Sequence, residues 1–166
     1  PASPEEEAAL CAFRNIVAEK VGDQTANDVD KFVTLFPDQL AKQDGWYGIE
    51  IPERSPQFSW MGRFGTIVNP RPDLEASLIS ISVLRAIRDR VYPITVLLDG
   101  EPGILERLPV GSGDAVYLNV QPRRGPRRVE VVKVLTNDVC RPSDIEDSSD
   151  NRELSILVDR VMFHFE

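Results

Sequence analysis

Apolar and polar positions follow two different periods along this chain, and the change comes near residue 45. Before it, apolar residues recur every three to four positions, as they do on one face of a helix. After it, apolar residues alternate with polar ones in short runs between prolines and glycines, as they do in strands. The pattern therefore predicts a helical segment at 1–44 and a β domain at 45–166.

Two helices are predicted in the first segment. The first covers residues 4–21, where Ser3 opens a capping box and Gly22 ends the helix. The second begins near residues 25–27, and Pro37 is expected to kink or break it before a last turn. The apolar stripe of this second helix is Val29, Phe32, Val33, Phe36 and Leu40. The two helices form a predicted hairpin whose apolar faces need a covering partner.

The second segment divides into about seven to nine short strands separated by turns. Asp99 and Gly100 form a strong hairpin signal, and residues 104–108 are expected as the returning strand. In the last strand the alternation changes parity between Val158 and Val161, which predicts a bulge. The predicted strands cover residues 64–69, 74–83, 92–98, 104–108, 115–120, 128–135 and 155–165.

None of these strands alternates with a convincing helix of β-α-β length, and residues 84–90 are expected as a polar loop or a strand end. This arrangement favours an antiparallel sandwich over a parallel sheet. The predicted fold is therefore mainly β: an antiparallel, jelly-roll-like β-sandwich preceded by an N-terminal α-helical hairpin.

The composition narrows the classes of function. A formal net charge of −8 argues against binding a nucleic-acid backbone or an anionic membrane surface. No apolar run reaches the roughly 20 residues of a membrane span. Cys11 and Cys140 lie far apart, and the single histidine, His164, lies close to the C-terminus. We therefore expect no metal site, no cofactor and no Cys-His nucleophile, and we expect structural thiols in a reducing, cytoplasmic compartment.

Candidate ligand-binding residues gather in residues 45–62, which contain both tryptophans. Aromatic rings pack against the C–H faces of sugars, and charged side chains hydrogen-bond the hydroxyl groups. The candidates for an aromatic platform are Trp46, Tyr47 and Trp60. The candidates for hydrogen bonding are Glu50, Arg54, Arg63 and Arg152. Two alternatives stay open: the tryptophans fill the core or edge of the sandwich, and Glu50 and Arg152 form a structural ion pair.

The order of motifs resembles a known family. Gly-Trp-Tyr-Gly-Ile-Glu at 45–50 and Phe-Ser-Trp-Met-Gly at 58–62 resemble the opening of a jelly-roll-like, carbohydrate-binding-like accessory domain. Such domains accompany bacterial glycosyltransferases and methyltransferases of surface-polysaccharide synthesis. Residues 93–100 resemble its central hairpin, and Asp-Asn-Arg-Glu-Leu at 150–154 resembles its closing segment, whereas Ser155 departs from a position that more often holds glycine. The resemblance implies a β-sandwich and a setting in glycan biosynthesis.

Three functions follow as hypotheses. The first is a non-catalytic carbohydrate-binding or scaffolding domain of such a glycosyltransferase or methyltransferase. The second is a protein–protein assembly module that uses the helical stripe and one sheet face, with a homo-oligomer left open. The third is a small glycan lyase or hydrolase, which needs two carboxylates across a cleft. The candidate carboxylates are Glu50, Glu53, Asp99, Glu101 and Asp114.

Two further features bear on partners. The chain begins with Pro1 rather than Met, so we expect either a processed product or a fragment of a longer protein, which leaves room for a catalytic partner domain outside this sequence. The turn at 123–128 carries four arginines, which suit either an anionic glycan or the protection of a sheet edge.

Overall fold

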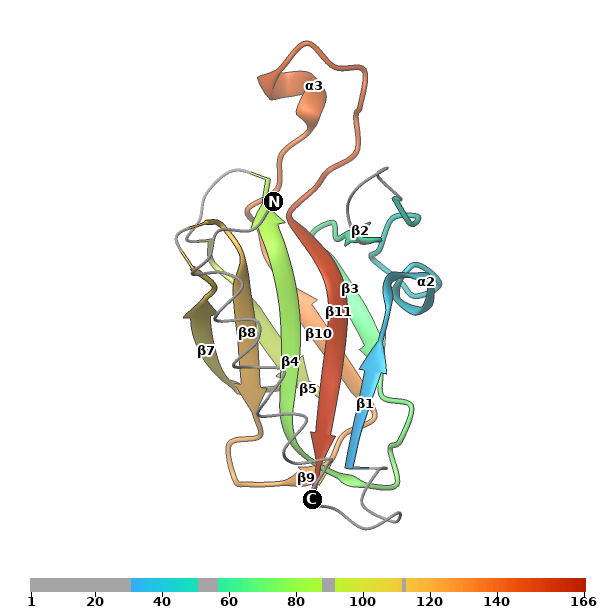
Figure 1. The fold of residues 1–166 in the computed structure, drawn as a ribbon, viewed down its shortest axis with the longest axis vertical. Helices are drawn as coiled ribbons and strands as arrows, with labels where there is room; N and C mark the ends of the chain where they lie inside the picture. The colour runs from blue at the N-terminus through green and yellow to red at the C-terminus, as the bar shows by residue number, and fades with distance from the viewer. Residues whose placement is uncertain (1–30, 51–56, 88–91, 112) are drawn as a thin grey trace.

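The computed structural model describes residues 31–50, 57–87, 92–111 and 113–166. These residues form two antiparallel sheets, with one short helix beside them and another at the end of a projecting loop (Figure 1). The helices are α2 (Pro37–Leu40) and α3 (Pro142–Ile145). The strands are β1 (Phe32–Leu35), β2 (Ser59–Trp60), β3 (Phe64–Val68), β4 (Glu75–Ala86), β5 (Thr95–Leu98), β6 (Glu101–Pro102), β7 (Ile104–Pro109), β8 (Val116–Gln121), β9 (Arg127–Arg128), β10 (Val131–Leu135) and β11 (Ile156–Phe165).

The chain crosses repeatedly from one sheet to the other. The larger sheet has the order β1-β11-β4-β8-β7, with β2 also paired to β11 and β9 to β4. The smaller sheet has the order β3-β10-β5-β6. Strands that are neighbours in a sheet are therefore mostly distant in sequence, and the β-sandwich predicted from the alternating pattern is confirmed.

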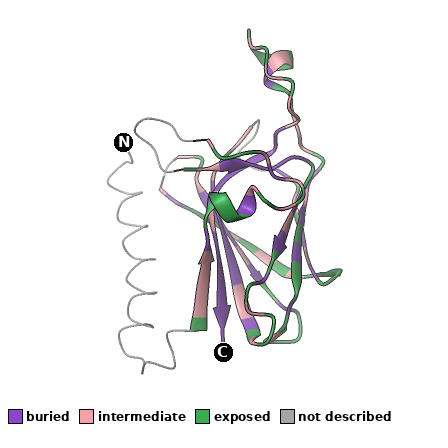
Figure 2. Ribbon diagram, turned by 90° about the vertical axis from the view of Figure 1, so that its right-hand side faces the viewer, coloured by how far each residue is buried: buried purple, intermediate pink, exposed green. Residues whose placement is uncertain are grey.

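The core lies between the two sheets, where the strands present their buried faces to each other (Figure 2). The larger sheet contributes Ile79, Leu118 and Phe163, each 0% exposed, and the smaller sheet contributes Ile67 and Val132, also 0% exposed. Burying a side chain of this size contributes about 1.5–3 kcal/mol. The alternation of apolar and polar residues in these strands therefore sets which face of each sheet lies inside.

The helix predicted across residues 32–35 is wrong, because these residues form strand β1. Strand β1 pairs antiparallel with β11, from Phe32 opposite His164 to Leu35 opposite Val161. A last helical turn does follow, since α2 begins at Pro37. Three apolar residues among four suit either type of element, and pairing with a central strand decides between them here.

The hairpin predicted at Asp99 and Gly100 is confirmed, but its returning strand is not the expected one. Strand β6 returns from the turn and pairs Glu101 with Leu98. Residues 104–108, which were expected in that role, belong to β7, which pairs with β8 in the larger sheet. The chain leaves the smaller sheet at Gly103, where an added Cβ would lie 2.5 Å from Val120 Cγ1.

The predicted bulge in the last strand is confirmed. The register between β11 and β4 shifts at Leu157/Val158 and again before Arg160. Strand β4 continues through Ala86, so the start of the segment 84–90 is a strand end.

Other predictions lie outside the described residues. The helix at 4–21 and the start of the second helix belong to residues 1–30, and Arg54 and Glu53 lie within residues 51–56. In the part of the chain that is described, no helix has the length and apolar character needed to cross a membrane.

Candidate functional site

The opening stretch forms two antiparallel arms at one end of the sandwich. Trp46 lies opposite Met61, and Glu50 lies opposite Phe58. The N–H of Gly62 donates to the carbonyl of Gly45 at 3.0 Å. Gly45 has a φ of 90°, and a Cβ on it would lie 2.0 Å from the carbonyl oxygen of Phe64. Glycine is therefore required where this arm meets the start of β3.

Both tryptophans are packed inside the protein. Trp46 is 8% exposed, belongs to the main core, and donates its indole N–H to the carbonyl of Thr66 at 3.0 Å. Trp60 is 4% exposed and packs in a second cluster with Leu154 and Leu157. An aromatic platform made of exposed tryptophans is therefore absent from the described surface, and the interpretation of both rings as core and edge packing agrees with their burial.

Tyr47 is the half-buried member of the aromatic candidates. The guanidinium of Arg152 lies 5.3 Å from the centroid of its ring. Arg152 also binds Glu50 at 2.9 Å and Asp150 at 2.8 Å, so the predicted ion pair between the start and the end of the domain is present. The hydrogen bond from Arg152 lowers the pKa of the Asp150 carboxyl and raises the pKa of Arg152 itself. Two carboxylates already satisfy Arg152, which favours a structural role for this cluster.

Arg63 forms a second ion pair close by. Its Nε lies 2.9 Å from Glu153 Oε2, and Arg141 binds the other oxygen of Glu153 at 3.4 Å. The hydrogen bond from Arg63 lowers the pKa of the Glu153 carboxyl, and the same bond raises the pKa of Arg63. The side chain of Arg63 remains 55% exposed, so it lines the surface as well as anchoring residues 152–154 to the opening stretch.

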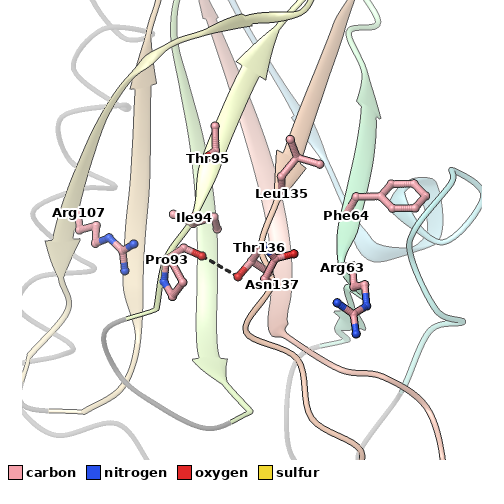
Figure 3. Close-up of a pocket in the computed structure, with 9 residues that line it drawn as sticks. All are labelled: Arg63, Phe64, Pro93, Ile94, Thr95, Arg107, Leu135, Thr136 and Asn137. Carbon is pink, nitrogen blue, oxygen red and sulfur yellow. Dashed lines mark hydrogen bonds between the residues drawn. The ribbon is translucent and has the colours of Figure 1, made fainter.

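Two adjoining pockets meet at Arg63 and Phe64. The first, which we call the Tyr47 pocket, has a volume of about 390 Å³ and is lined by Gly45, Trp46, Tyr47, Gly62, Arg63, Phe64 and Glu153. The second, which we call the Arg107 pocket, has a volume of about 480 Å³ and is lined by Arg63, Phe64, Pro93, Ile94, Thr95, Arg107, Leu135, Thr136 and Asn137. Both lie where β3 begins, and the Arg107 pocket extends to the start of β5 and the end of β10. Figure 3 shows Arg107 and Arg63 on opposite sides of the Arg107 pocket.

The pockets bring together only some of the predicted site residues. Trp46, Tyr47 and Arg63 line the Tyr47 pocket. Glu50 and Arg152 do not line the Tyr47 pocket. Arg152 contacts the ring of Tyr47, and Glu50 is paired with Arg152. Trp60 lines neither pocket and instead packs beneath Arg85, whose guanidinium lies 5.4 Å from the ring centroid.

The sequence did not single out the remaining lining residues. Phe64 and Arg107 come from strands β3 and β7, and Asn137 comes from the loop after β10, so no local spacing connects them. Glu153 stands beside Arg152 in the closing motif, and that adjacency was the one available signal.

The carboxylates considered for hydrolysis do not converge in the described part of the chain. Asp99 and Glu101 both bind Arg127, at 3.3 and 2.9 Å, at the far end of β5 from the Arg107 pocket. Glu50 binds Arg152 instead. Within residues 31–50, 57–87, 92–111 and 113–166, no group of three acidic, histidine or cysteine side chains is placed to hold a metal ion.

Comparison with known proteins identifies no relative: no protein-family model matches this chain, and no curated protein sequence matches it.

Proposed function

We propose that this chain is a non-catalytic carbohydrate-binding or scaffolding domain that works beside a catalytic domain in cell-surface polysaccharide synthesis. The observation that carries the proposal is the pair of adjoining pockets at Arg63 and Phe64. Their lining combines aromatic rings and aliphatic surface with guanidinium, carboxylate, hydroxyl and amide groups. Sugars need this combination, because they present C–H faces and hydroxyl groups together.

Two further features support the setting. The resemblance of residues 45–62 and 150–154 to a jelly-roll-like accessory domain points to bacterial glycosyltransferases and methyltransferases as the parent enzymes. The strand orders β1-β11-β4-β8 and β3-β10-β5-β6, with the chain crossing between sheets, support the jelly-roll-like form of the fold. A reducing, cytoplasmic compartment remains part of the proposal.

In this proposal the sugar packs against the rings of Tyr47 and Phe64, rather than against the two tryptophans that the sequence suggested. Phe64 is 38% exposed and is shared by both pockets, so a sugar bound in either one contacts its ring. Trp46 contributes only to the wall of the Tyr47 pocket, where its fluorescence reports on a bound ligand.

The test is a titration of tryptophan fluorescence and calorimetric heat with a panel of bacterial surface oligosaccharides. We expect saturable binding by the wild type, a loss of about tenfold or more in Phe64→Ala, and little change in Val68→Ala. Val68 is a matched control because it lies on the same exposed face of β3 and outside both pockets. Folded protein that binds no member of the panel contradicts the proposal.

A second candidate is the assembly module, which the outer face of the smaller sheet favours. Val68 and Val131 lie opposite each other on β3 and β10 and are 51% and 37% exposed. Phe64 and Leu135 form the next apolar pair on the same face. Thr66 and Lys133 lie between these two apolar pairs. Exposed apolar pairs on a sheet face favour an interaction surface.

Sedimentation analysis over a range of concentrations separates the two functions. Self-association that Val68→Asp abolishes, together with unchanged sugar titrations, supports the assembly module. A monomer at all concentrations, with sugar binding that depends on Phe64, supports the carbohydrate-binding domain.

A further inference from the structure

Arg107 is held in place from two sides in the Arg107 pocket. Its Nη2 donates a hydrogen bond to the backbone carbonyl of Tyr92. Its guanidinium also lies 4.7 Å from the centroid of the Tyr92 ring, which is buried in the core. The side chain extends from β7 toward Pro93 at the start of β5 (Figure 3). Such contacts fix the guanidinium before any ligand arrives, which lowers the entropy cost of binding.

Among the described residues, the charge of Arg107 has no carboxylate counterion. Nη1 is buried and makes no hydrogen bond, so a backbone carbonyl is the only hydrogen-bond acceptor that the described residues give this guanidinium. No ion pair joins Arg107 to a carboxylate of the described chain. Arg63, on the other side of the pocket, is already paired with Glu153. A guanidinium that has no carboxylate partner among the described residues, in a partly desolvated site, favours an anionic group such as a carboxylate or a phosphate.

The rest of the pocket matches a sugar that carries this anion. Thr95 and Asn137 are exposed polar residues at its rim, and Leu135 and Phe64 supply apolar surface. Thr136 is committed to the fold, because its hydroxyl donates to the carbonyl of Pro93 at 2.6 Å and accepts from the N–H of Asp138. That bond ties the end of β10 to the start of β5, so two walls of the pocket are fixed relative to each other.

The net charge of the chain favours a carboxylate over a phosphate as the bound anion. The net charge of −8 repels a phosphate dianion more strongly than a carboxylate, and the Arg107 pocket offers one unpaired guanidinium. A single negative charge is therefore the better match.

We propose that the Arg107 pocket binds an acidic sugar, such as a uronic acid residue of a polysaccharide, with its carboxylate on Arg107. This inference rests on the proposed carbohydrate-binding function and names the class of glycan that the site takes. Since charge-assisted hydrogen bonds contribute about 1.5–3 kcal/mol, the carboxylate should raise affinity by about 10- to 100-fold.

The experiment compares glucuronic acid oligosaccharides with the same oligosaccharides after reduction of each carboxyl to a hydroxymethyl group. Calorimetric titration should show the acidic form binding about 10- to 100-fold more tightly to the wild type. Arg107→Gln should lose that preference, so that the acidic and neutral forms bind to it with similar affinity. Arg124→Gln is the matched control, because Arg124 is exposed on the turn between β8 and β9, outside the Arg107 pocket, and should keep the preference.

The outcomes separate the inference from the function on which it rests. Equal binding of acidic and neutral oligosaccharides overturns the inference and leaves the carbohydrate-binding function in place. Loss of the preference in Arg124→Gln instead of Arg107→Gln also overturns it, and places the acidic sugar on the arginine turn. Inorganic phosphate that displaces the acidic oligosaccharide at equal concentration overturns the choice of carboxylate. If no saccharide binds, both proposals fail. Comparing the two ligands on the wild type needs no variant, so it holds even if Arg107→Gln does not fold.

Discussion

Tyr92 shows how one buried polar group sets a measurable property. The side chain is 3% exposed, and its hydroxyl makes no hydrogen bond. Burial raises the pKa of this phenol to about 12, and the nearby charge of Arg107 opposes the rise. The folded state therefore favours the neutral phenol. The guanidinium of Arg107 packs against the Tyr92 ring.

We predict that one of the three tyrosines ionises near pH 12 while the protein remains folded. A folded-state pKa above the usual value of 10.0 means that the stability from neutral Tyr92 is complete below pH 10 and is lost as the pH rises through about 12. The full loss is about 3 kcal/mol, since each pKa unit corresponds to about 1.4 kcal/mol. Ultraviolet absorbance of the phenolate, followed with far-ultraviolet circular dichroism, measures both events.

The control for this titration is Tyr92→Phe. The ionisation step near pH 12 should disappear from the absorbance curve. The free energy of unfolding at neutral pH should change by less than about 1 kcal/mol, because no hydrogen bond is lost. Three tyrosines that all titrate near pH 10 in folded protein contradict the prediction.

Among the structural elements, the hairpin between β5 and β6 depends on Asp99, which lies in its turn. This residue has a φ of 50°, and Gly100 follows with a φ of 86°, which is the backbone of the tight turns that suit twisted hairpins. The Asp99 carboxylate accepts the N–H groups of Glu130 at 3.1 Å and Val131 at 2.8 Å. The turn therefore also holds the start of β10, a strand that is distant in sequence.

We predict that Asp99→Ala lowers the free energy of unfolding by about 2–3 kcal/mol. Alanine is strained at positive φ and leaves two backbone N–H groups without their acceptor. Asp99→Asn should cost about 1 kcal/mol or less, because asparagine tolerates this conformation and keeps one acceptor oxygen. Urea unfolding of both variants measures the difference, and equal losses would show that the carboxylate bonds to β10 do not matter.

The elements also show how far sequence patterns reach. The strand pattern, the Asp99 turn and the bulge in β11 followed from alternation and turn chemistry alone. Residues 32–35 did not, because Phe-Val-Thr-Leu has no strict period and only its pairing with β11 makes it a strand. The role of β7 was also missed, since the sequence contains no sign that the chain changes sheets at Gly103.

At the scale of the whole molecule, ion pairs tie the opening stretch to the closing segment. Arg152 joins Glu50 to Asp150, and Arg63 binds Glu153, across about a hundred residues of chain. These contacts close the end of the sandwich where the two pockets lie. Their side chains are partly exposed, so salt should weaken them.

We predict that thermal stability falls as the pH drops below about 4.5, in part through these pairs. The pKa values of Asp150 and Glu153 lie below the usual 3.8 and 4.5, so their contribution is complete above those values and is lost as the pH falls through the folded-state values. Arg63→Gln combined with Arg152→Gln should lower Tm at pH 7 and flatten its dependence on acid. Added salt should also lower Tm at pH 7 and reduce its dependence on pH, but by less than the double variant does.

Calorimetric scans at several pH values measure this effect. Arg71 and Asp73 form an ion pair at 2.9 Å within one turn, so Arg71→Gln is a control that leaves the long-range pairs intact. If Tm falls by the same amount with decreasing pH in the wild type and in the double variant, the prediction is contradicted.

The candidate site was only partly visible in the sequence, for a physical reason. Trp46, Tyr47 and Arg63 lie in one motif, and they do line one pocket. Their exposure depends on packing, however, and both tryptophans prove to be buried. Arg107 carries no local signal, because its importance comes from the Tyr92 ring and from the lack of a carboxylate partner among the described residues.

The sequence by itself determined the mainly β class, most strand positions, the tight turn and the ion pair between Glu50 and Arg152. Each of these depends on short-range periodicity, backbone preference or a recognisable motif. The tertiary structure alone decided the order of strands in the two sheets, the burial of the tryptophans and the assembly of the Arg107 pocket. These depend on contacts between strands that are distant in the chain, and local patterns do not encode which distant strand becomes a neighbour.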